Sequence, residues 1–149
     1  MVWDRNRRHM KLRILGCSGG IGRYLRTTSM LRDNDILIEA GTWVGDLSLK
    51  ELTWINHAFV GHSYLDHVSH TPFLVATVEW MRNMPITVQT TRAKQNILRQ
   101  RRFNWKIRPD FTHIPGPREV KSAQLITSRK CCDTTRFLDY RRVYCAVWR

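Results

Sequence analysis

Apolar and polar positions change pattern every few residues along the first hundred residues, and each change predicts a new element. Residues 10–15 predict a short strand of mixed character, which runs into a turn at residues 16–22. Four of these seven turn residues are glycine, which permits backbone conformations that other residues avoid. The turn matches neither glycine-rich phosphate-binding motif, because no Lys follows the glycines and Leu25 stands where GxGxxG requires its third glycine.

The next two apolar runs predict a β-hairpin. They cover residues 28–32 and 36–40 and flank Asp33-Asn34-Asp35, whose residue types favour a turn. Behind this hairpin, Ser48 and Glu51 have the spacing of a helical capping box. A short amphipathic helix follows, with Leu49, Leu52 and Ile55 at helical spacing.

Two further strands and two further helices follow. Residues 58–60 are a brief apolar run, typical of a strand buried on both faces. Pro72 favours a helix start, and residues 73–81 continue as a largely buried helix. Residues 86–90 predict another strand, and residues 91–102 predict a helix with a basic face.

The alternation of strands and helices predicts an α/β fold, organised as a sandwich. We divide the chain into a basic N-terminal extension (1–9), one domain (10–125) and an unpatterned basic tail (126–149). Within the domain, the aromatic and Pro-rich segment 103–117 predicts an ordered loop or an edge strand. In such folds, ligands bind beyond the carboxyl ends of the strands.

Composition favours a globular protein outside membranes. The apolar share is 42%, with six Trp, and no apolar run approaches the ~20 residues of a membrane-spanning helix. The basic start lacks the apolar stretch of a secretory signal, so we expect a cytoplasmic protein. Four cysteines without a CxxC pair support neither a zinc ribbon nor a disulfide framework.

The net charge of +13 is the strongest compositional signal. Residues 92–108 hold seven Lys and Arg with no acidic residue between them. This segment could meet a phosphate-bearing partner, nucleic acid included, but a solvated helix face is the preferred explanation, since net charge alone says little about function.

Candidate chemistry lies directly after the buried strand 58–60. His62, Asp66 and His67 fall within six residues, and imidazoles with a carboxylate suit Zn, Mn or Fe. The segment resembles the His-x-His-x-Asp-His motif of the metallo-β-lactamase-fold hydrolases. Residues 15–20, 27–29 and 36–42 resemble the opening strand and hairpin of that superfamily, with Glu39 where Asp is usual. Residues 65–74 and 103–111 resemble the class II cyclic-nucleotide phosphodiesterases.

This resemblance implies the N-terminal half of an αββα sandwich. It also implies two divalent metal ions, with zinc as the first candidate. By position, His62 is implied as a ligand of the first metal, and Asp66 and His67 as ligands of the second. Asp66 is also implied to orient the attacking water, which makes it the catalytic residue. Glu39 more naturally supports the loop from beneath than binds metal. The implied reaction is hydrolysis of a 3′,5′-cyclic nucleotide by in-line attack on phosphorus.

Two departures from the motif predict weak activity. Tyr64 occupies the position of the second His, and a phenol is a poor ligand for a divalent metal at neutral pH. The remaining ligands implied by the resemblance are two His and a bridging Asp from a C-terminal half. After His70 the sequence has only His113, outside any ligand motif. The tail after residue 126 has the character expected of a truncation or a shifted reading frame.

Two alternative functions stay open. The first is a transfer-RNA-processing type of nuclease with the same fold, favoured by the basic segment 92–108. The second is a non-catalytic, basic nucleic-acid-binding protein. Trp43, Trp54, Trp80 and Trp105 are expected in the core rather than in a substrate platform.

Overall fold

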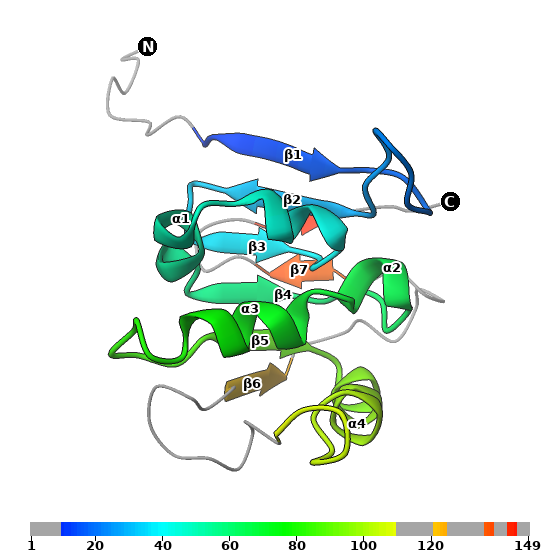
Figure 1. Ribbon diagram of the computed structural model, residues 1–149, viewed down its shortest axis with the longest axis vertical. Helices are drawn as coiled ribbons and strands as arrows, with labels where there is room; N and C mark the ends of the chain where they lie inside the picture. Colours follow the sequence, from blue (N-terminus) through cyan, green and yellow to red (C-terminus); the bar gives the residue numbers. More distant parts are fainter. Residues whose placement is uncertain (1–9, 110–120, 125–135, 139–142, 146–149) are drawn as a thin grey trace.

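The computed structural model describes residues 10–109 in full and, after them, the backbone of the three strands at 121–124, 136–138 and 143–145. Within these residues, one sheet has six strands in the order β1-β2-β3-β4-β5-β6, and β7 and β8 form a separate antiparallel pair (Figure 1). The elements in chain order are β1 (Leu12–Gly16), β2 (Ser29–Arg32), β3 (Ile36–Ile38), the 3-10 helix η1 (Thr42–Asp46), α1 (Leu49–Trp54), β4 (His57–Phe59), α2 (Leu65–Val68), α3 (Thr71–Val78), β5 (Thr87–Thr90), α4 (Arg92–Arg101), β6 (Lys121–Gln124), β7 (Arg136–Leu138) and β8 (Val143–Cys145). No helix in this described part of the chain has the length and apolar character that crossing a membrane requires.

The six-stranded sheet contains both antiparallel and parallel strand pairs. β1, β2 and β3 pair antiparallel, whereas β3, β4, β5 and β6 pair parallel. The predicted hairpin between β2 and β3 is confirmed. Asp33 and Asn34 in its turn have φ values of 52° and 73°, a left-handed conformation that Asp and Asn tolerate better than most residues.

One face of the sheet carries the core. Leu31, Leu37, Ala58 and Val88 occupy paired positions across β2, β3, β4 and β5, and all four are buried. Helices α1 and α3 lie over this face in Figure 1, and their buried residues belong to the same apolar cluster. Burial of this continuous row is the main stabilising contribution that the sheet makes.

The other face of β1 is less protected. Side chains alternate along a strand, so Leu12 and Ile14 point away from the face on which Arg13 reaches α1. Leu12 is 47% exposed and Ile14 is 64% exposed. Among the described residues, this edge strand therefore presents apolar side chains that nothing covers fully.

The sequence located most elements correctly but misjudged where some of them end. Helix α3 ends at Val78 rather than at residue 81, so Trp80 and Met81 are exposed, as is Phe73. Leu49 is also exposed, because α1 buries only the side that carries Leu52. Strands β6, β7 and β8 were not predicted, and residues 110–117 of the predicted loop lie outside the described residues.

The expectation that four Trp side chains belong to the core is wrong. Trp43, Trp54, Trp80 and Trp105 are between 37% and 72% exposed. Two of them stack with cations instead of apolar neighbours: Lys50 lies 5.3 Å from the Trp54 ring centre and Arg26 lies 5.9 Å from that of Trp43. A cation over an aromatic face stabilises a partly solvated ring without burying it.

The capping box of α1 predicts a pH-dependent stability. Ser48 donates from both N and Oγ to the Glu51 carboxylate, at 2.8 and 2.7 Å, and Arg13 donates to its other oxygen at 2.7 Å. These bonds from Ser48, and then from Arg13, lower the pKa of Glu51 to about 2. A lowered folded-state pKa stabilises the protein above the unfolded value of roughly 4.3, and this contribution is lost as the pH falls toward 2.

We therefore expect Glu51→Gln to remove this pH dependence. Glutamine retains much of the capping geometry but cannot titrate. At neutral pH the free energy of unfolding of Glu51→Gln should therefore be about 1 kcal/mol lower than that of the unaltered chain. This difference should disappear as the pH falls from 4.5 to 2. Urea denaturation at pH 6 and pH 2.5 measures both values. Parallel pH profiles for the two proteins would contradict the assignment.

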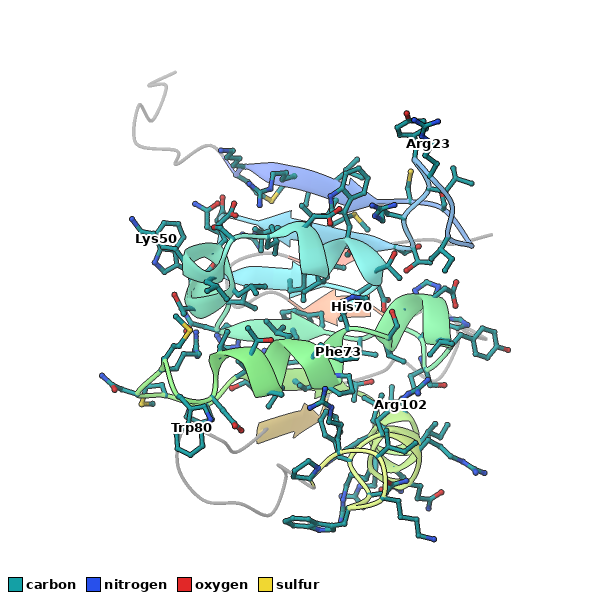
Figure 2. All side chains as sticks on the ribbon, viewed as in Figure 1. Arg23, Lys50, His70, Phe73, Trp80 and Arg102 are labelled. Carbon is teal, nitrogen blue, oxygen red and sulfur yellow. The ribbon has the colours of Figure 1, made fainter. Side chains whose placement is uncertain are left out.

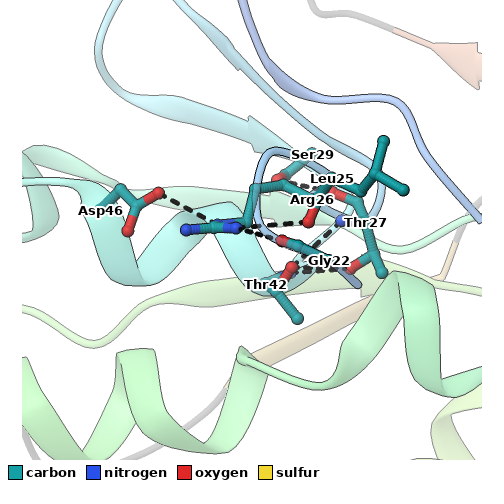
Figure 3. A network of polar contacts seen from close by, with 7 residues as sticks. All are labelled: Gly22, Leu25, Arg26, Thr27, Ser29, Thr42 and Asp46. Atoms are coloured by element: carbon teal, nitrogen blue, oxygen red, sulfur yellow. Dashed lines mark hydrogen bonds and ion pairs between the residues drawn. The ribbon is translucent and has the colours of Figure 1, made fainter. Parts of the chain in front are cut away.

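A polar network anchors the glycine-rich loop that precedes β2. Thr27 N donates to Thr42 Oγ1 at 3.0 Å, and Thr42 N donates to Thr27 Oγ1 at 2.8 Å. Arg26 donates to Asp46 at 3.3 Å and to the Gly22 carbonyl at 3.1 Å (Figure 3). These contacts tie the loop to η1.

Gly41 permits this close approach and predicts a large stability effect. A Cβ at this position would lie 2.5 Å from both Thr27 Oγ1 and the Thr28 carbonyl. Gly41→Ala should therefore lower the free energy of unfolding by about 1–3 kcal/mol through overpacking. Gly19→Ala is the matched control, since a Cβ at residue 19 would have no heavy atom within 4 Å. Equal unfolding midpoints in urea for the two variants would rule out a steric role for Gly41.

Candidate metal centre

The loop that carries the candidate ligands begins where β4 ends, between two parallel neighbours. Val60 N donates to the Gln89 carbonyl at 2.9 Å, and Thr90 Oγ1 donates to the Val60 carbonyl at 2.8 Å. The chain is therefore held to β5 up to Val60. The following residues turn away and enter α2 at Leu65, beyond the carboxyl end of the strand.

Glu39 supports this loop from the neighbouring strand β3. Its side chain is 3% exposed, and Oε1 accepts a hydrogen bond from Gly61 N at 2.9 Å. Its backbone has a φ of 58°, an uncommon conformation for a residue other than glycine. The next residue, Ala40, donates to the His67 carbonyl at 2.7 Å. The end of β3 thus holds both the start of the loop and α2.

Asp66 and His67 come together on α2. His67 Nε2 lies 3.3 Å from Asp66 Oδ2, and His67 Nδ1 lies 3.4 Å from Glu39 Oε2. The imidazole is therefore placed between two carboxylates. The nearby Glu39 carboxylate raises the pKa of His67 against the opposing effect of burial, and the charge of Asp66 acts in the same direction as Glu39. The arrangement stabilises positive charge at this point, whether a proton or a cation supplies it.

His62 and Tyr64 lie beside this pair. The ring centres of His62 and His67 are 5.2 Å apart, and the Tyr64 ring meets His62 edge-on at 4.8 Å. Tyr64 is 67% exposed, so its phenol points into solvent rather than into the loop. The structure therefore brings His62, Asp66 and His67 into one neighbourhood and leaves Tyr64 on its rim.

The other candidate side chains lie elsewhere. His57 opens β4 at the opposite end of the strand, where its Nδ1 lies 3.3 Å from Gln89 Nε2. His70 caps α3, with its Nδ1 3.2 Å from Ser69 Oγ, and burial lowers its pKa. Asp110 and His113 fall outside the described residues.

The Asp66–His67 pair fits two donors to one divalent metal. Two ligands on a tetrahedral zinc at about 2.1 Å would be about 3.4 Å apart, close to the observed 3.3 Å. Glu39 Oε2 and His67 Nδ1 are buried without a hydrogen bond, although they lie within ion-pair distance. A metal-binding His commonly has such a carboxylate behind its second nitrogen.

The ligand set is nevertheless incomplete in the described part of the chain. No group of three or more His, Cys, Asp or Glu side chains is arranged there to hold a metal ion. His62 is near the pair but does not converge on the same point. The donors that fit are thus Asp66 and His67, with Glu39 orienting His67.

One feature of the site was not predicted from the sequence. A cleft of about 360 Å³ adjoins the loop at Ser63, and α4 supplies its other wall with Arg101 and Arg102. The sequence contained a signal for it in the acid-free basic segment 92–108. Only the tertiary structure places that charge in a cleft shared with Ser63 of the loop and Val68 of α2.

Comparison with known proteins identifies the fold. No protein-family model matches the sequence, and no curated protein matches it. The structure is similar to the crystal structure of unliganded yeast PDE1, with a TM-score of 0.63 and 17% sequence identity. The match covers 83% of this chain and 53% of yeast PDE1, so the chain spans about half the length of that protein. The chain therefore has an α/β architecture with the metallo-β-lactamase fold, as its sequence predicted.

Proposed function

We propose that this chain is a metal-dependent phosphodiester hydrolase whose substrate is a 3′,5′-cyclic nucleotide. The observation that carries the proposal is the Asp66–His67 donor pair, 3.3 Å apart beyond the carboxyl end of β4 and held from behind by Glu39. The similarity to a protein named as a phosphodiesterase supports the same reaction class. Zinc is the metal that this donor set suits best.

Each residue then has a defined role. Asp66 and His67 would hold one metal, and His62 would belong to the site of a second. When bound, the metal lowers the pKa of an attacking water and stabilises charge on the phosphate oxygens. Asp66 also orients that water toward phosphorus, while Glu39 fixes the orientation of the His67 imidazole. The oxygen of the attacking water forms a bond to phosphorus and gives up a proton to the solvent. One phosphorus–oxygen ester bond breaks, its oxygen takes up a proton, and a linear monophosphate results.

The proposal is tested with the purified chain and 3′,5′-cyclic AMP. We expect hydrolysis with added Zn²⁺ and none with excess EDTA. Chromatography of the linear product measures the reaction. Product formation at equal rates with and without EDTA would exclude a metal-dependent reaction. A zinc-loaded, folded protein without any product would exclude the substrate.

The basic helix α4 favours a second candidate, a nuclease that acts on RNA. Arg99 and Arg101 in its last turn and Arg102 at its C-cap carry three positive charges, and Arg101 and Arg102 line the cleft that adjoins the candidate loop. A nuclease should cleave a short RNA faster than cyclic AMP, and only with metal. A non-catalytic binding protein should retain RNA in EDTA, with affinity that falls steeply as salt rises.

A further inference from the structure

The cleft between α4 and the candidate loop has the size and lining of a small-molecule site. Its volume of about 360 Å³ lies within the range of roughly 300–1,000 Å³ that is usual for ligand pockets. Figure 2 labels Arg102 beside α4, on the side toward α3. The lining residues are Ser63, Val68, Ile97, Leu98, Arg101 and Arg102.

The lining has an apolar wall, formed by Val68 with Ile97 and Leu98 of α4, and a cationic wall one helical turn further along, formed by Arg101 and Arg102. Val68 and Leu98 are buried, and Ile97 is 42% exposed, so the apolar wall is partly open to solvent. Arg101 is exposed and Arg102 is half-buried. A flat apolar group fits against the first wall, and an anion fits against the second.

The two guanidinium groups lack acidic partners within the described part of the chain. Among the residues that the structure describes, neither Arg101 nor Arg102 forms an ion pair or a side-chain hydrogen bond. Adjacent like charges repel each other, and residues 92–108 contain no acid that could offset them. A phosphate group relieves this repulsion and accepts the paired N–H groups of a guanidinium with good geometry.

We propose that Arg101 and Arg102 bind the phosphate group of a nucleotide in this cleft, with its base against the wall that contains Ile97. Ser63 lines the cleft and lies between His62 and Tyr64, so the bound nucleotide is adjacent to the candidate metal loop. The identity of the ligand rests on the proposed function. Arg101 and Arg102 act as substrate-positioning residues.

Binding of 5′-AMP to the full chain in EDTA tests the proposal without any catalytic step. Titration calorimetry should show that the double variant Arg101→Gln/Arg102→Gln binds at least about tenfold more weakly, because each charge-assisted hydrogen bond contributes substantially. The double variant Arg92→Gln/Lys94→Gln is the matched control. It removes the same charge from the other end of α4, outside the cleft lining, and should change affinity less than about twofold.

Several results would overturn the proposal. Equal weakening in both double variants would mean that general charge attracts the nucleotide. Equal affinity for adenosine and 5′-AMP would exclude a phosphate site, and inorganic phosphate that fails to compete with 5′-AMP would do the same. Tighter binding of a short RNA, weakened equally in both variants, would assign the charge to a nucleic-acid surface.

The two proposals fail in different ways. Nucleotide binding that depends on Arg101 and Arg102, without metal-dependent hydrolysis, would overturn the function and retain the site. Hydrolysis of cyclic AMP with an unchanged KM in Arg101→Gln/Arg102→Gln would overturn the site and retain the function. Circular dichroism of each variant checks that α4 remains folded, since Gln has a helix propensity similar to that of Arg.

Discussion

Tyr64→Phe and Tyr64→His should differ in zinc affinity by about 100-fold, with the histidine variant binding more tightly. Tyr64 stands at the one position of the metal loop where the resemblance implies a ligand and the sequence lacks one. Four-ligand structural zinc sites bind with about 10–16 kcal/mol, so one added ligand contributes roughly 3 kcal/mol. At 1.4 kcal/mol for each factor of ten, this corresponds to about 100-fold.

The structure accommodates this substitution, but the Tyr64 side chain points into solvent, so an imidazole at this position has to turn toward His62 to bind the metal. The Tyr64 ring is 67% exposed and 4.8 Å from the His62 ring, so an imidazole can replace it without a steric clash in the core. Competition with a chromogenic zinc chelator measures the affinity of both variants and of the unaltered chain. Tyr64→Phe isolates the loss of the phenol and should match the unaltered chain. If all three proteins retain no zinc, a ligand at position 64 is not what limits binding, and the prediction is wrong.

Asp66→Asn should lower kcat/KM for metal-dependent hydrolysis of cyclic AMP by about 10²-fold, the cost of misplacing a reacting group. The substitution preserves shape but removes the carboxylate that lies 3.3 Å from His67 Nε2. The amide is a weaker metal ligand, and it orients the attacking water less well than a carboxylate does. The loss should appear in kcat rather than in KM alone, because the role of Asp66 is in the transition state.

Asp46→Asn is the control for this prediction. Asp46 is an exposed carboxylate on η1 whose bond to Arg26 lies outside the metal loop. The control substitution removes the same charge and should leave kcat/KM within about twofold, as expected for a screened surface charge. An equal loss of activity in both variants would show that net charge, and not the position of Asp66, is responsible.

Local chemistry made much of this fold predictable from the sequence. The turn at Asp33-Asn34-Asp35, the capping box of Ser48 and Glu51, and the apolar run 58–60 each depend on residues within a few positions of one another. The position of His62, Asp66 and His67 directly after this run also predicted that these side chains follow a buried strand. These signals can be recognised without knowledge of the rest of the chain, because turns, caps and strand periodicity are short-range properties.

Tertiary structure alone decided which of these residues meet. Glu39 reaches His67 only because β3 and β4 are parallel neighbours, and Asp66 faces His67 while His62 remains beside the pair. The exposure of Trp80 depends on where α3 ends, and that of Phe73 on which side of α3 packs against the sheet. The cleft at Arg101 and Arg102 exists because α4 packs beside the loop. These are long-range contacts, and a sequence pattern carries no information on which distant segments the folded chain brings together.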